Sequence, residues 1–128
     1  ERRGRRPRIH ADAVDAGALV VPGSDWSVVP SVSPWNAIET LVTRQQIGGV
    51  GEALAPQERI TLEQAFDLFT VNAARQMGNA NRTGRIEQGL LADLIVVDRN
   101  PFRIPVTDIH KVKVLRTLIN GEIVYETP

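Results

Sequence analysis

Residues 18–26, with the sequence ALVVPGSDW, decide the fold that we expect, because a short apolar run ends there in an acid. Residues 19–21 (LVV) are too continuous for a half-exposed strand and too few for a helix, so they predict a parallel strand covered on both faces. Ligands of parallel α/β folds bind at the carboxyl ends of strands, which places Asp25 for chemistry. The alternative is a structural role for Asp25 in a turn or helix cap.

Length and composition set broad bounds. A chain of 128 residues with 42% hydrophobic residues can form one domain that buries about two-thirds of its unfolded surface. The absence of cysteine excludes disulfides, thiolate metal sites and a cysteine nucleophile. The longest apolar runs fall far short of the roughly 18 residues that cross a bilayer, so we expect a soluble, cytoplasmic protein without a membrane partner.

Positive charge is concentrated at the start of the chain, although the net charge is zero. Five arginines lie within the first eight residues: Arg2, Arg3, Arg5, Arg6 and Arg8. Such a cluster can bind nucleic-acid phosphates, but without interleaved aromatic residues it more often forms a solvated arm, which makes nucleic acid an unlikely partner. Because the first residue is not methionine, we expect a truncated or processed piece of a longer protein.

The residues before the expected strand predict a short helix. Residues 9–16 (IHADAVDA) have a helical pattern that Gly17 closes. A helix, a tight turn and a strand form the αβ half of a βαβ repeat. His10 lies at the opposite end of the strand from Asp25, which favours a surface or packing role over that of a ligand or base.

A second helix is predicted to begin at Pro34, with Ser33 as its cap. Its apolar face, which we interpret as core packing, contains Trp35, Ile38, Leu41 and Val42. The loop of residues 27–33 should overhang the Asp25 end of the strand. Residues 45–51 (QQIGGVG) lack the lysine and hydroxyl ending of a phosphate loop, so we interpret them as a connector.

Another helix is predicted to begin after Thr61, which forms a capping box with Gln64. The helical pattern continues through residues 70–77 and ends at Gly78. The apolar face of this helix consists of Leu62, Ala65, Phe66 and Phe69.

The last third of the chain predicts β structure. Short strands are expected around Ile86 and at residues 92–97. Two β-rich runs joined by Asn120 and Gly121 predict an antiparallel hairpin with a type I′ turn. We expect residues 92–97 to pair with this hairpin, in a sheet separate from residues 18–21.

Three segments resemble the carboxyl end of the amidohydrolase superfamily: GSDW (23–26), TGRIEQGLLADLIVVDRNP (83–101) and LINGEIVY (118–125). The pattern G-x-I-x-x-G-x-x-A-D-L-x-V-x-D, from Gly84 to Asp98, is the most specific of these features. The resemblance covers the chain from about Ile9 and is strongest to the branch that includes N-substituted formamide deformylase.

This resemblance implies an α/β fold in two parts. Residues 1–80 would form the last strand and helices of a TIM-type (β/α)8 barrel, the C-terminal part of a metal-dependent hydrolase. Residues 81–128 would form the C-terminal strands of a small β-sandwich domain, which identifies the family without contributing to the chemistry.

The resemblance also implies a role for Asp25, as a ligand of the catalytic metal, as the proton acceptor from the attacking water, or as both. Ser24 and Trp26 would lie next to the substrate, and Ser27 stands where these relatives usually have proline. His10 and His110 do not match the family's metal-binding histidines. The divalent metal, which we expect to be zinc, would therefore need ligands from a missing N-terminal part of the same enzyme.

We therefore expect a fragment of a metal-dependent amidohydrolase that hydrolyses non-peptide carbon–nitrogen bonds in small amides, formamides or cyclic amides. Alone, the chain should be inactive, should bind no metal, and should form a homo-oligomer because a barrel strand without neighbours leaves an open edge. The alternative is a non-catalytic interaction module with the arginine-rich arm as its contact surface.

Overall fold

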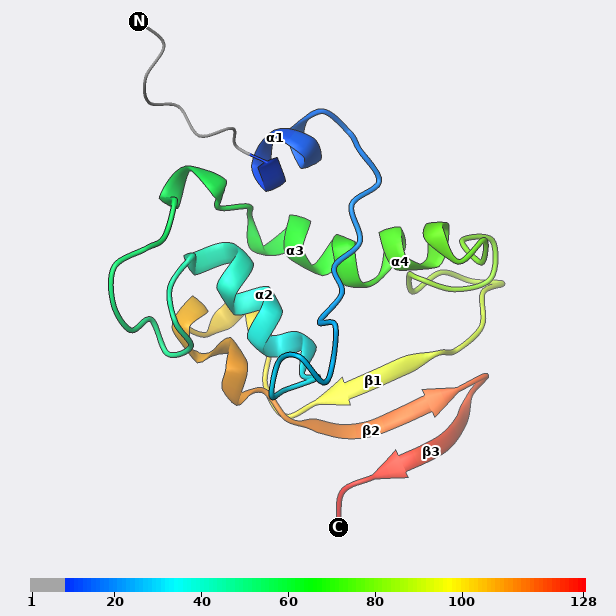
Figure 1. Ribbon diagram of the computed structural model, residues 1–128. Helices are drawn as coiled ribbons and strands as arrows, with labels where there is room; N and C mark the ends of the chain where they lie inside the picture. Colours follow the sequence, from blue (N-terminus) through cyan, green and yellow to red (C-terminus); the bar gives the residue numbers. More distant parts are fainter. Residues whose placement is uncertain (1–8) are drawn as a thin grey trace, which may run out of the picture.

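The computed structural model describes residues 9–128, which form a group of helices beside a three-stranded antiparallel sheet (Figure 1). The helices are α1 (Ile9–Asp15), α2 (Pro34–Thr43), α3 (Leu62–Phe69) and α4 (Val71–Gln76). The strands are β1 (Leu94–Val97), β2 (Val114–Ile119) and β3 (Glu122–Glu126). Short 3-10 helices lie between them: η1 (Pro56–Glu58), η2 (Pro101–Arg103) and η3 (Val106–Lys111). The arginine-rich arm and the His10 side chain, to which two of our predictions apply, lie outside the described part.

The hydrophobic core joins the helices to η3. Its buried members are Ala11, Trp35, Ile38, Ile60, Ala65, Leu68, Ile109 and Val112. Trp35 and Ile38 confirm the predicted apolar face of α2, and Leu41 and Val42 pack against the same core at its margin. Pro34 begins α2 as predicted, but Ser33 at the N-cap makes no capping hydrogen bond with its side chain.

The capping box at the start of α3 is confirmed. The Thr61 side chain accepts a hydrogen bond from the Gln64 backbone N–H, and the Gln64 side chain accepts one from the Thr61 N–H. The helical run that we expected to continue breaks at Thr70, whose φ of −119° and ψ of −85° are not helical. The Thr70 hydroxyl donates to the carbonyl of Phe66, a local bond that competes with the backbone ladder. Two short helices, α3 and α4, therefore replace one.

The three strands run antiparallel in the order β1-β2-β3, as the pattern of residues 92–97 and the terminal hairpin predicts. Leu94 of β1 lies opposite Leu118 of β2, which in turn lies opposite Ile123 of β3. Asn120 and Gly121 have φ values of 52° and 82°, and two consecutive positive values define the type I′ turn.

Two predicted strands are absent. Residues 18–21 are extended but belong to no sheet, because no strand of the described residues lies beside them to complete a ladder. The Val20 carbonyl instead accepts a hydrogen bond from the Asn72 side chain. The residues around Ile86 form turns, and Ile86 itself is 88% exposed, so it does not pack into the core.

Candidate active site

The candidate acid, Asp25, lies in a turn at the end of an extended segment. This segment, drawn in blue in Figure 1, runs from α1 past the α3–α4 pair. Asp25 opens the turn by accepting a backbone hydrogen bond from Val28 at 2.8 Å. The backbone of Asp25 has a φ of 50°, in the left-handed region that only a small share of non-glycine residues adopt. Asp25 therefore lies in a turn with a strained backbone, and the prediction of a strand end is wrong. Asp25 is nevertheless exposed to solvent.

The surroundings of Asp25 leave its carboxylate accessible. Ser24, Asp25 and Trp26 are all exposed, and the side chain of Trp26 is 66% exposed. Within the described residues, the Asp25 carboxylate has no hydrogen bond and no ion pair. A turn-capping aspartate normally bonds a backbone N–H two residues on, so this carboxylate lacks the contact that would make it purely structural.

Metal binding by the described residues alone is not supported. They contain no group of three or more histidine, cysteine, aspartate or glutamate side chains that could hold a metal ion. A catalytic zinc needs about three protein ligands, and Asp25 could supply one of them. The residues therefore do not fit a complete metal centre. No described helix is both long and apolar enough to cross a bilayer.

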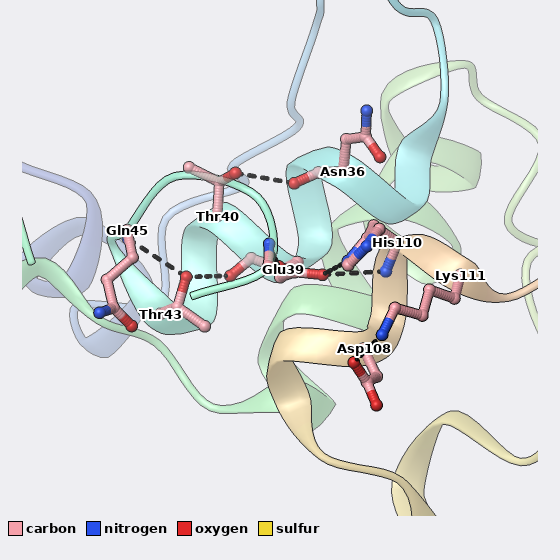
Figure 2. Close-up of polar contacts among 9 residues, drawn as sticks. Asn36, Glu39, Thr40, Thr43, Gln45, Asp108, His110 and Lys111 are labelled. Carbon is pink, nitrogen blue, oxygen red and sulfur yellow. Dashed lines mark hydrogen bonds and ion pairs between the residues drawn. The ribbon is translucent and has the colours of Figure 1, made fainter. Parts of the chain in front are cut away.

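A buried polar cluster that the sequence did not predict lies between α2 and η3 (Figure 2). Glu39 is fully buried and accepts three hydrogen bonds. One oxygen accepts the Gly48 N–H at 2.6 Å. The other accepts the His110 backbone N–H at 2.9 Å and contacts His110 Nδ1 at 2.7 Å.

The Glu39–His110 pair resembles the orienting half of a catalytic triad, in which a carboxylate holds a histidine ring. Within the described residues, however, no hydroxyl is bonded to His110, and every contact of the Glu39 carboxylate serves to join chain segments. We therefore interpret the pair as structural. The sequence contains a signal for this buried cluster. Glu39 lies four residues after Trp35 and three before Val42, on the apolar face of α2. An acid on such a face needs buried hydrogen-bond partners.

A second unpredicted contact reaches the segment that leads to Asp25. The side-chain amide of Asn72, on α4, donates to the Val20 carbonyl at 3.1 Å. These residues are 52 positions apart, so no local sequence pattern predicts the bond. Beside the same segment, an apolar hollow of about 390 Å³ is lined by Val20, Val21, Pro22 and Gly23 together with residues of α1, α2 and α3.

Comparison with known proteins identifies the class. Residues 10–125 match the amidohydrolase family, so the chain belongs to that family. The chain is 34% identical over 113 residues to N-substituted formamide deformylase of Arthrobacter pascens, covering 88% of this chain and 20% of that protein. It is 30% identical over 127 residues to 5-methylthioadenosine/S-adenosylhomocysteine deaminase of Clostridium tetani, covering 91% of this chain and 28% of that protein.

A solved structure shares the arrangement of the elements. The crystal structure of an amidohydrolase from Thermotoga maritima MSB8 superposes with a TM-score of 0.69 at 26% identity. The match covers 94% of this chain and 26% of that one. The chain thus spans only 20% to 28% of the length of these relatives.

Proposed function

We propose that this chain is the C-terminal part of a longer hydrolase that cleaves non-peptide carbon–nitrogen bonds in small amides, formamides or cyclic amides. Membership of the amidohydrolase family supports this reaction class, and the likeness to a formamide deformylase supports the choice of substrates to test. The single observation that carries the role of this chain is Asp25, an exposed acid without a partner among the described residues, in a strained turn.

In this proposal Asp25 is the proton-transfer group. One of its carboxylate oxygens accepts a proton from the water that attacks the carbonyl carbon, and the same oxygen returns a proton to the departing amine nitrogen. The charge balances because the acid is ionised before and after the cycle. Exposure of the carboxylate serves this role, since both the water and the amine must reach it.

The remaining parts of the site would come from outside the described residues. The family is generally metal-dependent, and we propose that a divalent metal, zinc by preference, is held by ligands from the rest of the enzyme, with Asp25 as one further ligand. Ser24 and Trp26 would contact the substrate next to Asp25, because they share its exposed turn.

The test is Asp25→Asn in the full-length enzyme, assayed by amine or ammonia release from N-substituted formamides, linear amides and cyclic amides. Asparagine keeps the size of the side chain and tolerates the positive φ, but it cannot accept the proton. We expect kcat to fall by about a hundred- to ten-thousandfold, the usual value of a positioned acid or base, with little change in thermal stability.

Asp15→Asn is the matched control, because Asp15 is also exposed and lies at the end of α1. It should keep the parental kcat. If Asp25→Asn also keeps the parental kcat, Asp25 is a turn residue and the proposed role is wrong.

A further inference from the structure

We propose that Asn72 is a positioning residue for Asp25: its side-chain amide holds the backbone of the segment that carries the acid. The inference rests on the proposed function, since it assigns Asn72 a role through Asp25. Asn72 itself lies on α4 and is not placed against the reacting atoms.

The first observation is the hydrogen bond itself. The Asn72 amide donates to the Val20 carbonyl at 3.1 Å in a partly buried position, five residues before Asp25. Among the described residues, no other side chain bonds to the backbone of residues 18–25. The remaining bonds of this segment are short-range backbone bonds, such as that from the Val20 N–H to the Ala18 carbonyl.

The second observation is that this segment has few fixed points: Val20 packs against the margin of the hydrophobic core, whereas residues 23–25 are exposed. The apolar hollow of about 390 Å³ borders residues 20–23. No strand of the described residues pairs with the segment. The bond from Asn72 and the packing of Val20 therefore fix the segment between α1 and the turn of Asp25, and the bond from Asn72 is the polar one.

The third observation is that α4, the helix that carries Asn72, is closely packed against Gly84. Gly84 lies so close to α4 that a Cβ there would approach the Ala74 Cβ to 2.6 Å and the Thr70 carbonyl oxygen to 3.3 Å. Since Gly84 also has a φ of 97°, only glycine fits at this position. Gly84 is the first residue of the family pattern Gly84–Asp98. A residue of that pattern thus packs directly against α4, the helix whose Asn72 binds the segment that leads to Asp25.

The chemical reason for such a support is geometric. A misplacement of about 1 Å at a reacting group can cost on the order of a hundredfold in rate. A backbone fixed at Val20 restricts where the Asp25 carboxylate can lie, whereas a free segment would sample many positions. Loss of the Asn72 amide should therefore lower kcat while leaving KM nearly unchanged.

The experiment compares Asn72→Ala with Asn36→Ala in the full-length enzyme, using the formamide and amide panel. Asn36 is a matched control: it is also a half-buried helical asparagine, and its side chain forms no hydrogen bond within the described residues (Figure 2). We expect Asn72→Ala to lower kcat by roughly three- to tenfold, the equivalent of one neutral hydrogen bond, and Asn36→Ala to change it less than twofold.

A double mutant separates positioning from a merely structural role. If Asn72 acts through Asp25, Asn72→Ala in an Asp25→Asn background should lower kcat less than twofold further, because the positioned group is already gone. Asn72→Gln keeps an amide donor and should recover part of the loss. An equal loss in both backgrounds would overturn the proposal.

A readout without substrate completes the test. Hydrogen–deuterium exchange of the peptide 18–27 should become faster in Asn72→Ala and stay unchanged in Asn36→Ala. If Asn72→Ala fails to fold, Asn72→Asp replaces it, since aspartate has the same shape and its ionised carboxylate cannot donate the bond. Unchanged exchange in residues 18–27 would overturn the role of Asn72. Full kcat in Asp25→Asn would overturn the proposed function instead, which keeps the two failures distinct.

Discussion

Two carboxylates in this chain have opposite environments, and the difference indicates opposite roles. Asp25 is exposed and has no bonded partner among the described residues, whereas Glu39 is fully buried and accepts three hydrogen bonds. A group that transfers protons to a substrate must be reachable, and Glu39 is not. A buried carboxylate held by three hydrogen-bond contacts is instead suited to hold segments together.

Removal of the Glu39 carboxylate should destabilise the protein. Glu39→Ala leaves the Gly48 and His110 N–H groups without their acceptor and opens a cavity between α2 and η3. We expect the free energy of unfolding to fall by about 3 kcal/mol, because two part-buried N–H groups lose their acceptor, at roughly 1–3 kcal/mol for each unsatisfied group. Urea unfolding followed by circular dichroism measures the change.

Glu52→Ala is the control for this change, because Glu52 is an exposed glutamate in a loop. It should alter the free energy of unfolding by less than about 0.5 kcal/mol. Equal stability of Glu39→Ala and Glu52→Ala would show that the buried cluster does not hold α2 to η3.

At the scale of elements, two aspartates of the family pattern flank β1 and bind it to the neighbouring strand. Asp93 precedes β1, and its carboxylate accepts the Asn120 N–H just after β2 at 2.8 Å. Asp98 follows β1 and accepts the Lys113 N–H just before β2, also at 2.8 Å. Each end of the β1–β2 pair is thus closed by a carboxylate. These hydrogen bonds give the two aspartates of the pattern a structural role that is independent of catalysis.

The stabilisation of the β1–β2 pair by the Asp98 carboxylate should depend on pH. Its hydrogen bond from the Arg99 guanidinium, followed by that from the Lys113 N–H, holds the pKa of Asp98 below the ordinary value of 3.8. The folded state therefore favours the ionised acid, so this stabilisation is complete above pH 3.8 and is lost as the pH falls through the lower folded pKa. The variant Asp98→Asn should be less stable than the parent at pH 7, and the gap should narrow below pH 3.8.

Thermal unfolding of the parent and of Asp98→Asn at pH 7, 4 and 2 would measure this gap. Asp67→Asn, which changes an exposed acid on α3, controls for the change in net charge. A stability gap that stays constant over this range would contradict the assignment of the effect to the Asp98 carboxylate.

Elements that depend on neighbouring residues were predictable from the sequence, and elements that depend on distant partners were not. The capping box at Thr61 and the turn at Asn120 each form from residues that lie within a few positions of one another. The extended residues 18–21 show the opposite case, because a strand exists only where another strand completes its ladder. The same reasoning holds for the candidate site: the exposure of Asp25 could be anticipated, but its support by Asn72 spans 52 positions.

At the scale of the whole molecule, the described surface exposes many large apolar side chains. The sheet contributes part of it, with side chains about half exposed on all three strands: Ile95, Ile119, Ile123, Val124 and Tyr125. Outside the sheet, the loop residues Leu54 and Met77 add to it and are 70% and 72% exposed. Exposed apolar side chains in this number fit a surface that another protein surface covers. In the proposed longer enzyme, the rest of the chain would cover it.

The isolated 128-residue chain should therefore associate with itself and bind a hydrophobic dye. Within the described residues β3 is an edge strand, so its backbone N–H and C=O groups on the outer side are open to pairing with a second copy. Val124→Lys places a charge on this edge and should shift the distribution in light scattering toward the monomer, since charged side chains are a usual protection of edge strands. Leu54→Lys makes a similar change on an exposed residue outside the sheet, and should leave the association unchanged if the edge is responsible. A compact monomer at high concentration that binds no dye would contradict both the association and the interpretation of the chain as part of a larger protein.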